Sequence, residues 1–197
     1  PSPKSSAASD VYKRQVIKRN NVDKIVKLIP AEERKKLWGM GIKIGRYHIY
    51  LPKMLKPKAV EFRISLWKIY HNLSAKNKIP KSGLNFLIGL KFDKDFLLLC
   101  GFEKFGEFFV RIDILEKLFL KIIDSTKDKK FTVNADMMNL LGCSKENFYK
   151  LMTYMDYKKD KAVDTYIFKG DKMKKKKIIQ FDKKENPFNK LLSLNIK

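Results

Sequence analysis

Lysine offers the clearest chemistry in this sequence. A dense run lies near the C-terminus, and further polar and basic residues occupy the outward positions of an expected helix and the residues just after it. An ammonium group is a compact point charge that suits phosphate oxygens. The predicted nucleic-acid contacts are Lys145, Asn147, Lys150, Thr153, Lys158, Lys159, Lys172, Lys174, Lys175, Lys176 and Lys177. The alternative is that the final run is only a solvated basic loop.

Motifs for catalysis are missing. No G-x-x-x-x-G-K-[ST] phosphate loop occurs, nor an acidic box that could hold magnesium. His48 and His71 are the only histidines, and the sequence around them suggests no catalytic triad. Cys100 and Cys143 lack a second Cys or His at ligand spacing, so neither a disulfide framework nor a zinc site is predicted. We expect no catalytic residue, metal site or cofactor in this chain.

Charge points to a polyanionic partner. The 197 residues contain 44 Lys and Arg against 21 Asp and Glu, which gives a net charge of +23. Such a surface attracts nucleic acid. Most of the basic residues are lysines, so drift towards Lys codons in an AT-rich genome is the competing explanation. Since no apolar run approaches a membrane span and no signal peptide is present, we expect a cytoplasmic protein without a membrane partner.

The first fifteen residues have no periodicity and resemble a library scar. Asp10 to Gln15 reads DVYKRQ, which looks like the in-frame translation of a transposase mosaic-end oligonucleotide. If so, the native sequence starts at Val16, inside a longer protein whose N-terminal portion is missing. The alternative is an ordinary flexible N-terminus.

Hydrophobic periodicity predicts a small mixed helix and strand domain over residues 16–107. Its expected elements, in chain order, are a helix over 21–36 interrupted at Pro30, β structure over 42–51, a helix over 57–73, a loop over 74–83, a short helix over 93–100 and an extended stretch over 102–110. The helix over 57–73 should bury Trp67 in the core.

Residues 108–182 show the order of a winged helix. Asp113 and Glu116 resemble a capping box, and they open a helix whose Leu115, Leu118, Phe119, Ile122 and Ile123 share one face. A strand over 131–133, a helix capped by Asn134 and a third helix capped by Ser144 follow, with Gly142 between the two helices. Extended segments over 163–168 and 176–181, joined at Gly170 and Asp171, would form the hairpin, or wing. A tail over 183–197 carries a short helix. The predicted class is α+β, mainly helical.

Several stretches together resemble one family. They are Leu37–Gly39, Ile44–Arg46, Ile49–Pro57, Arg63, Leu66–Trp67, Gly101–Phe102, Val110–Glu116 and Ala135–Cys143. As a set they are similar to the region that follows the motor in bacterial relatives of the mitochondrial degradosome RNA helicase. The resemblance implies a superfamily-two helicase whose motor domains, with their ATP and magnesium, precede this chain.

The leading hypothesis is therefore an accessory C-terminal module that grips RNA or DNA for a helicase motor in the same parent chain. A stand-alone winged-helix regulator is an alternative, and it would bind duplex DNA as a dimer. A docking module for a protein such as a nuclease is a third, and it would show an exposed apolar patch. The sequence leaves open RNA against DNA and single against double strand.

Overall fold

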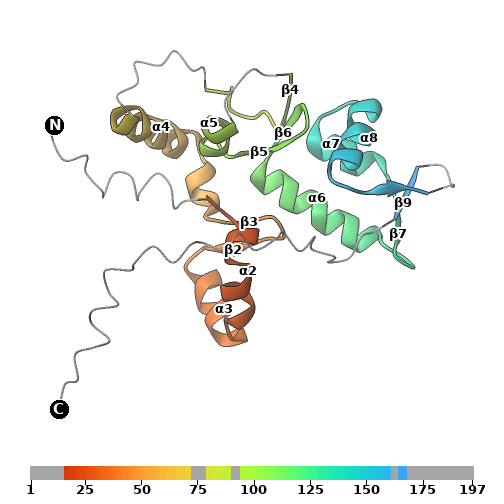
Figure 1. Cartoon of the computed structure of the whole chain (residues 1–197), viewed down its shortest axis with the longest axis horizontal. Helices are drawn as coiled ribbons and strands as arrows, with labels where there is room; N and C mark the ends of the chain where they lie inside the picture. Colours follow the sequence, from red (N-terminus) through yellow and green to blue (C-terminus); the bar gives the residue numbers. More distant parts are fainter. Residues whose placement is uncertain (1–15, 72–78, 90–93, 161–163, 168–197) are drawn as a thin grey trace, which may run out of the picture.

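The computed structural model describes residues 16–71, 79–89, 94–160 and 164–167. These residues form a mixed α/β structure, mostly helical, with three small antiparallel sheets of three strands each. Figure 1 shows the long helix α6 running through the middle, with the N-terminal elements on one side and the C-terminal ones on the other. Within the described ranges, no helix has both the length and the apolar character needed to cross a membrane.

The N-terminal elements make a helical arm on a small sheet. They are β1 (Val16–Lys18), α2 (Arg19–Leu28), α3 (Ala31–Gly39), β2 (Lys43–Ile44) and β3 (His48–Tyr50), and the sheet order is β1-β3-β2. Pro30 is the N-cap of α3, because its ring prevents α2 from continuing and suits a helix start. The predicted break at Pro30 and the predicted β structure are confirmed.

The middle elements surround the first hydrophobic core. They are the 3-10 helix η1 (Pro52–Leu55), α4 (Pro57–His71), β4 (Phe86–Ile88), α5 (Lys94–Leu99), β5 (Phe102–Phe105) and β6 (Phe108–Arg111), with sheet order β4-β6-β5. Ile64, Trp67, Phe96 and Phe109 pack in this core. Trp67 is only 9% exposed, which confirms its predicted place.

The C-terminal elements enclose the second core. They are α6 (Ile112–Ser125), β7 (Lys130–Thr132), α7 (Ala135–Leu141), α8 (Lys145–Tyr154), β8 (Lys158–Lys159) and β9 (Thr165–Ile167), with sheet order β7-β9-β8. The Asn134 and Ser144 side chains accept hydrogen bonds from the Met137 and Asn147 N–H groups, so both predicted helix caps are confirmed. Gly142 ends α7 in the left-handed conformation at φ +71°.

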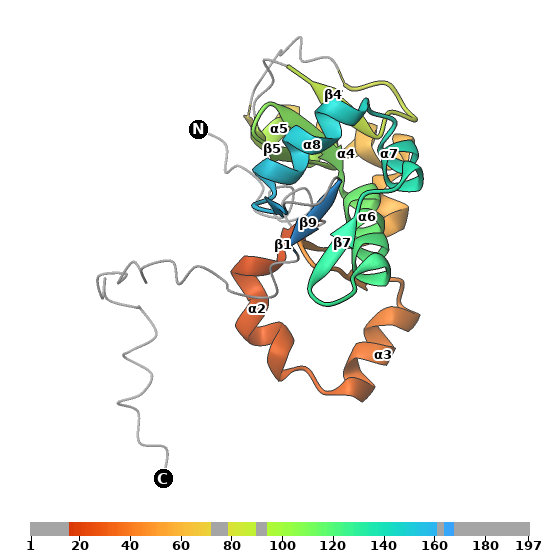
Figure 2. The same ribbon diagram turned by 90° about the vertical axis from the view of Figure 1, so that its right-hand side faces the viewer.

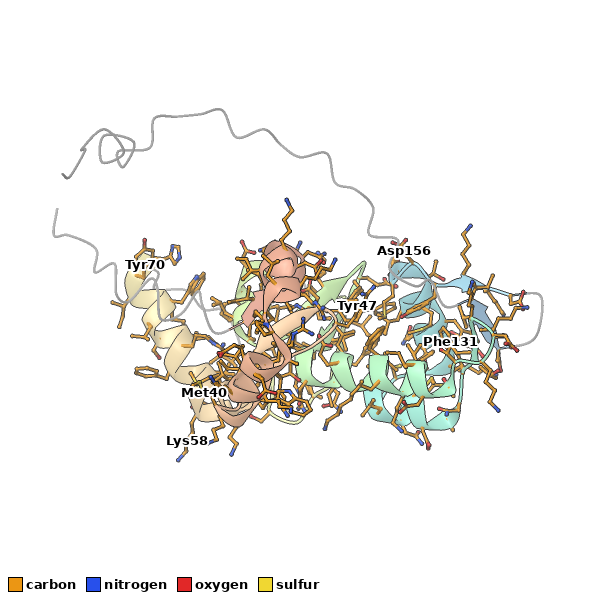
Figure 3. The ribbon with its side chains drawn as sticks, turned by 90° about the horizontal axis from the view of Figure 1, so that it is seen from below. Met40, Tyr47, Lys58, Tyr70, Phe131 and Asp156 are labelled. Atoms are coloured by element: carbon orange, nitrogen blue, oxygen red, sulfur yellow. The ribbon has the colours of Figure 1, made fainter. Side chains whose placement is uncertain are left out.

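Strand β6 is shared by the two cores. Phe108 and Val110 face the second core, whereas Phe109 between them faces the first, as the alternation of side chains along a strand requires. The boundary expected at residues 107 and 108 falls in the hairpin that joins β5 to β6. Figure 3 shows Tyr47 in the middle of the molecule, between the half that carries Tyr70 and the half that carries Phe131.

The predicted capping box at the start of α6 is wrong. The N-cap residue is Arg111, which makes no side-chain cap bond, and its guanidinium instead donates to the Asp113 carboxylate at 2.6 and 3.0 Å. Glu116 turns away to a distant partner described below. The apolar face is also shifted, since Ile123 is 43% exposed while Ile114 is buried.

Half of the predicted wing hairpin falls on described residues, because β9 lies within the expected strand 163–168. Strand β9 is the central strand of its sheet, with β7 on one side and β8 on the other. The predicted partner strand, the turn at 170–171 and the tail over 183–197 lie outside the described residues. Strand β8 precedes β9 in the chain and pairs with it antiparallel.

Candidate nucleic-acid interface

Helix α8 presents one buried and one exposed face. Phe148, Leu151 and Met152 are fully buried against the second core. Their spacing at i, i+3 and i+4 leaves the opposite side of the helix to solvent. Lys145 and Lys150 are both exposed on α8.

Charged side chains lie around the ring of Tyr149 on α8. The Lys145 Nζ lies 5.5 Å from the ring centroid and the Lys159 Nζ lies 5.3 Å from it. Lys145 also donates to Asp164 Oδ2 at 2.8 Å, and the Tyr149 hydroxyl donates to Asp164 Oδ1. Lys145, Tyr149, Lys159 and Asp164 form what we call the surface cluster.

The surface cluster keeps a positive charge near neutral pH. The hydrogen bonds from Lys145 and Tyr149 lower the pKa of Asp164, so its carboxylate stays ionised. The hydrogen bonds to Asp164 and Tyr149 raise the pKa of Lys145 to about 12. One carboxylate therefore faces two ammonium groups, Lys145 and Lys159, and the excess charge is available to an anion.

The structure brings together only part of the predicted site. Lys145 and Lys159 meet at Tyr149. Lys150 is exposed on α8, but five residues along the helix it points about 140° away from Lys145. Thr153 is exposed, but its hydroxyl donates to the Tyr149 carbonyl at 3.1 Å. Lys158 is exposed beside Lys159, on the other face of the sheet because successive strand residues alternate.

Asn147 does not join this group. It is half-buried, and two residues along a helix it points about 160° away from Lys145. The lysine run Lys172, Lys174, Lys175, Lys176 and Lys177 lies outside the described residues. Sequence reasoning missed Tyr149 and Asp164. The i, i+4 spacing of Lys145 and Tyr149 could have indicated the first, whereas no local pattern indicates the second.

A second charged cluster is buried where the N-terminal sheet meets β5 and α6. The Glu116 carboxylate accepts hydrogen bonds from the N–H groups of Arg46, Tyr47 and His48 at 2.5, 2.8 and 2.9 Å. Glu103 receives the His48 Nε2 at 2.8 Å and the Lys18 Nζ at 2.6 Å. Lys18, His48, Glu103 and Glu116 form what we call the buried cluster.

His48 therefore has carboxylate partners, which the residues next to it in the sequence did not indicate. Its side chain is 1% exposed, so a substrate has no access to it. Burial lowers the pKa of His48, but the carboxylates of Glu103 and Glu116 outweigh that effect and raise it above its usual value. Burial likewise raises the pKa of Glu103, and the bonds from His48 and Lys18 more than reverse this. The arrangement is a buried ion pair that joins chain segments.

The stretches Ile44–Arg46 and Val110–Glu116 meet in the buried cluster. A Cβ on Gly45 would collide with the Glu116 carboxylate, so a larger residue there would force the carboxylate away from the Arg46 N–H. Arg63 is also buried, at 1% exposed, and donates to the Met54 carbonyl at 3.0 Å. Gly45, Arg63 and Glu116 therefore hold parts of the fold together. No family model, curated protein or solved structure matches this chain.

Proposed function

We propose that this chain is a nucleic-acid-binding accessory module of an ATP-dependent RNA or DNA helicase, which grips the strand through its phosphates. The observation that carries the proposal is the convergence of the Lys145 and Lys159 ammonium groups on Tyr149. The net charge of +23 supports it, because a basic surface raises the local concentration of a polyanion.

We further propose that the C-terminal elements act as a winged helix. The order α6, β7, α7, α8, β8 and β9, with β9 between the other two strands, supports this assignment. Helix α8 then takes the place of the recognition helix, and the β8–β9 hairpin takes the place of the wing. The surface cluster lies where these two elements meet.

The chemistry favours contacts with the backbone over reading of bases. Ammonium groups act on phosphates as point charges and carry little shape specificity. Asn147 is the one predicted contact with an amide that could bond to adenine, and it is half-buried at the start of α8. Binding should therefore tolerate many sequences.

The catalytic step belongs, in this proposal, to motor domains upstream in the same parent chain. The phosphate loop and the acidic box that would hold ATP and magnesium are missing from the sequence, so we assign both ligands to the motor. A nuclease is a further candidate partner. The isolated chain should show no nucleic-acid-stimulated ATPase, and turnover that survives repurification would contradict this assignment.

The test of the interface is a salt titration of strand binding. Each phosphate contact contributes ~0.7 to 0.9 to the slope of log affinity against log salt, so Lys145→Gln with Lys159→Gln should flatten that slope by about 1.4 to 1.8. Lys56→Gln with Lys58→Gln removes the same charge elsewhere. Figure 3 shows Lys58 at the opposite end of the molecule from Phe131, so this control should change the slope little. Equal slopes for the two double variants would sink the assignment.

A second variant works in the opposite direction. Asp164→Asn removes the carboxylate that holds Lys145, so both ammonium groups can turn to phosphate and affinity should rise. Asp164 has φ +57°, a conformation that asparagine also adopts readily, so the backbone should accept the change. Weaker binding by this variant would show that Lys145 does not meet the strand.

A further inference from the structure

The arm formed by α2 and α3 leaves a tryptophan in solvent. Helix α3 contributes no buried residue, and Trp38 near its end is 63% exposed. The other tryptophan, Trp67, is 9% exposed. In Figures 1 and 2 the two helices project from the sheet, away from both cores. Trp38 is thus not part of either core.

The local backbone holds Trp38 beside a cation. Gly41, at φ +86°, reverses the chain after α3, with its N–H donating to the Trp38 carbonyl at 2.9 Å. The turn brings Lys43 back, so that its Nζ lies 4.6 Å from the centroid of the Trp38 ring. Lys43 thus lies over one face of the ring, and the side chain of Trp38 remains 63% exposed.

The arm is strongly basic. Between residues 19 and 46 there are eight basic side chains and three acidic ones, a net charge of +5. The basic residues are Arg19, Lys24, Lys27, Arg34, Lys35, Lys36, Lys43 and Arg46, and the acidic ones are Asp23, Glu32 and Glu33. This charge favours a polyanion over a neutral or basic protein surface as the occupant.

We propose that Trp38 is a stacking platform for one base of single-stranded nucleic acid, which would use the ring face opposite Lys43, with the Lys43 ammonium group available to the adjoining phosphate. An exposed aromatic ring within a basic surface is the combination by which proteins hold unpaired bases, because every base has a face that can stack. A duplex buries those faces, so the strand must be single here. The inference rests on the proposed function only for the class of polymer, since Trp38 and the surface cluster are separate sites.

The emission of the two tryptophans provides the first test. Stacking of a base on Trp38 should quench part of the tryptophan fluorescence when a thymidine single strand is added. Trp38→Phe leaves only the buried Trp67, so its emission should not respond to the strand. Because Trp38 is exposed, this variant should melt at the wild-type temperature. Wild-type emission that is unchanged at saturating strand would overturn the proposal and leave the exposed arm to a protein partner.

Affinity provides the second test. Trp38→Ala should weaken binding roughly 5- to 150-fold, as expected for the loss of one stacked base. On an abasic strand of equal length, wild type and variant should bind alike, because only the phosphates remain. An equal loss on both strands would overturn stacking.

The two proposals fail separately. Suppose that the Lys145 and Lys159 variant keeps the wild-type salt slope while the strand still quenches Trp38 fluorescence. The stacking site is then supported, and the α8 interface is contradicted. If the slope flattens while Trp38 emission ignores the strand, the reverse holds.

Discussion

The buried cluster and the surface cluster use the same kinds of groups in opposite surroundings. In the first, His48 and Lys18 face two carboxylates, with Glu116 and Glu103 at most 9% exposed. In the second, Lys145 and Lys159 face one carboxylate, and the lysines remain in solvent. Figure 3 places Tyr47, next to His48, in the middle of the molecule, whereas Asp156, just beyond α8, lies at its edge.

Burial decides what each cluster can do. In the buried cluster every charge must be matched within the chain, because an unmatched charge away from water is costly. In the surface cluster water screens the charges, so an excess of ammonium groups costs little and can be offered to a ligand. The first arrangement therefore supports the fold, and the second can bind.

Removal of Glu116 should have the largest effect on stability. Glu116→Ala leaves the N–H groups of Arg46, Tyr47 and His48 without their acceptor in the interior, which should cost about 3 to 5 kcal/mol of unfolding free energy. Chemical denaturation measures this difference. A loss below ~1 kcal/mol would mean that water replaces the carboxylate, and the contrast with the surface cluster would disappear.

A methyl group at Gly45 should have the next largest effect. Gly45→Ala places its Cβ against the Glu116 carboxylate, and such overpacking costs about 1 to 3 kcal/mol. Gly39→Ala is the matched control, because it lies at the end of α3 with nothing within 4 Å and should be neutral or slightly stabilising. Similar melting temperatures for the two variants would rule out the close approach at Gly45.

A change of pH should alter the stability that the buried cluster provides by less than either substitution does. A raised pKa for His48 means that the folded state holds its proton more tightly, so this stabilisation is complete below about 6.5 and is lost as pH rises through the folded-state pKa. A lowered pKa for Glu103 gives stabilisation that is present above about 4.5 and lost as pH falls. The pair should contribute most between these values. Melting curves of wild type and His48→Gln against pH should differ in slope above 6.5, and parallel curves would contradict the assignment.

Changes in the surface cluster should affect stability least. Lys145→Gln and Lys159→Gln remove groups that remain hydrated, so their melting temperatures should match the wild type even where strand binding changes. A clear drop in melting temperature would show that the cluster supports the fold, and the proposed interface would lose its main argument.

Local patterns predicted the local structure well. Asn134, Gly142 and Ser144 mark the ends of α7 and α8 because caps and left-handed turns depend on residues only a few positions apart. The packing of α7 on α8 through Leu141 and Phe148 followed from helical periodicity, and both side chains are buried.

Contacts between residues far apart in the chain could not be predicted from local sequence patterns. Glu116 has the spacing of a capping residue, but its carboxylate oxygens accept hydrogen bonds from backbone N–H groups about 70 residues earlier in the chain. Strand β8 is only two residues long, too short for an alternating pattern, so the sequence did not indicate it. Asp164 follows that strand, and its bond to Lys145 spans 19 residues of sequence, so no local pattern indicates it.

The alternation along β6 has a consequence for how the molecule unfolds. Since Phe109 anchors one core while Phe108 and Val110 anchor the other, neither core can open without exposing apolar surface that belongs to its neighbour. The two halves should then behave as one cooperative unit, and the β6 amides should be among the last to exchange with deuterium. A cut before Phe108 would expose the Phe109 side chain to water. It would also remove β5, the strand that pairs with β6. The C-terminal half, which contains α8, therefore depends on the N-terminal half for its own stability.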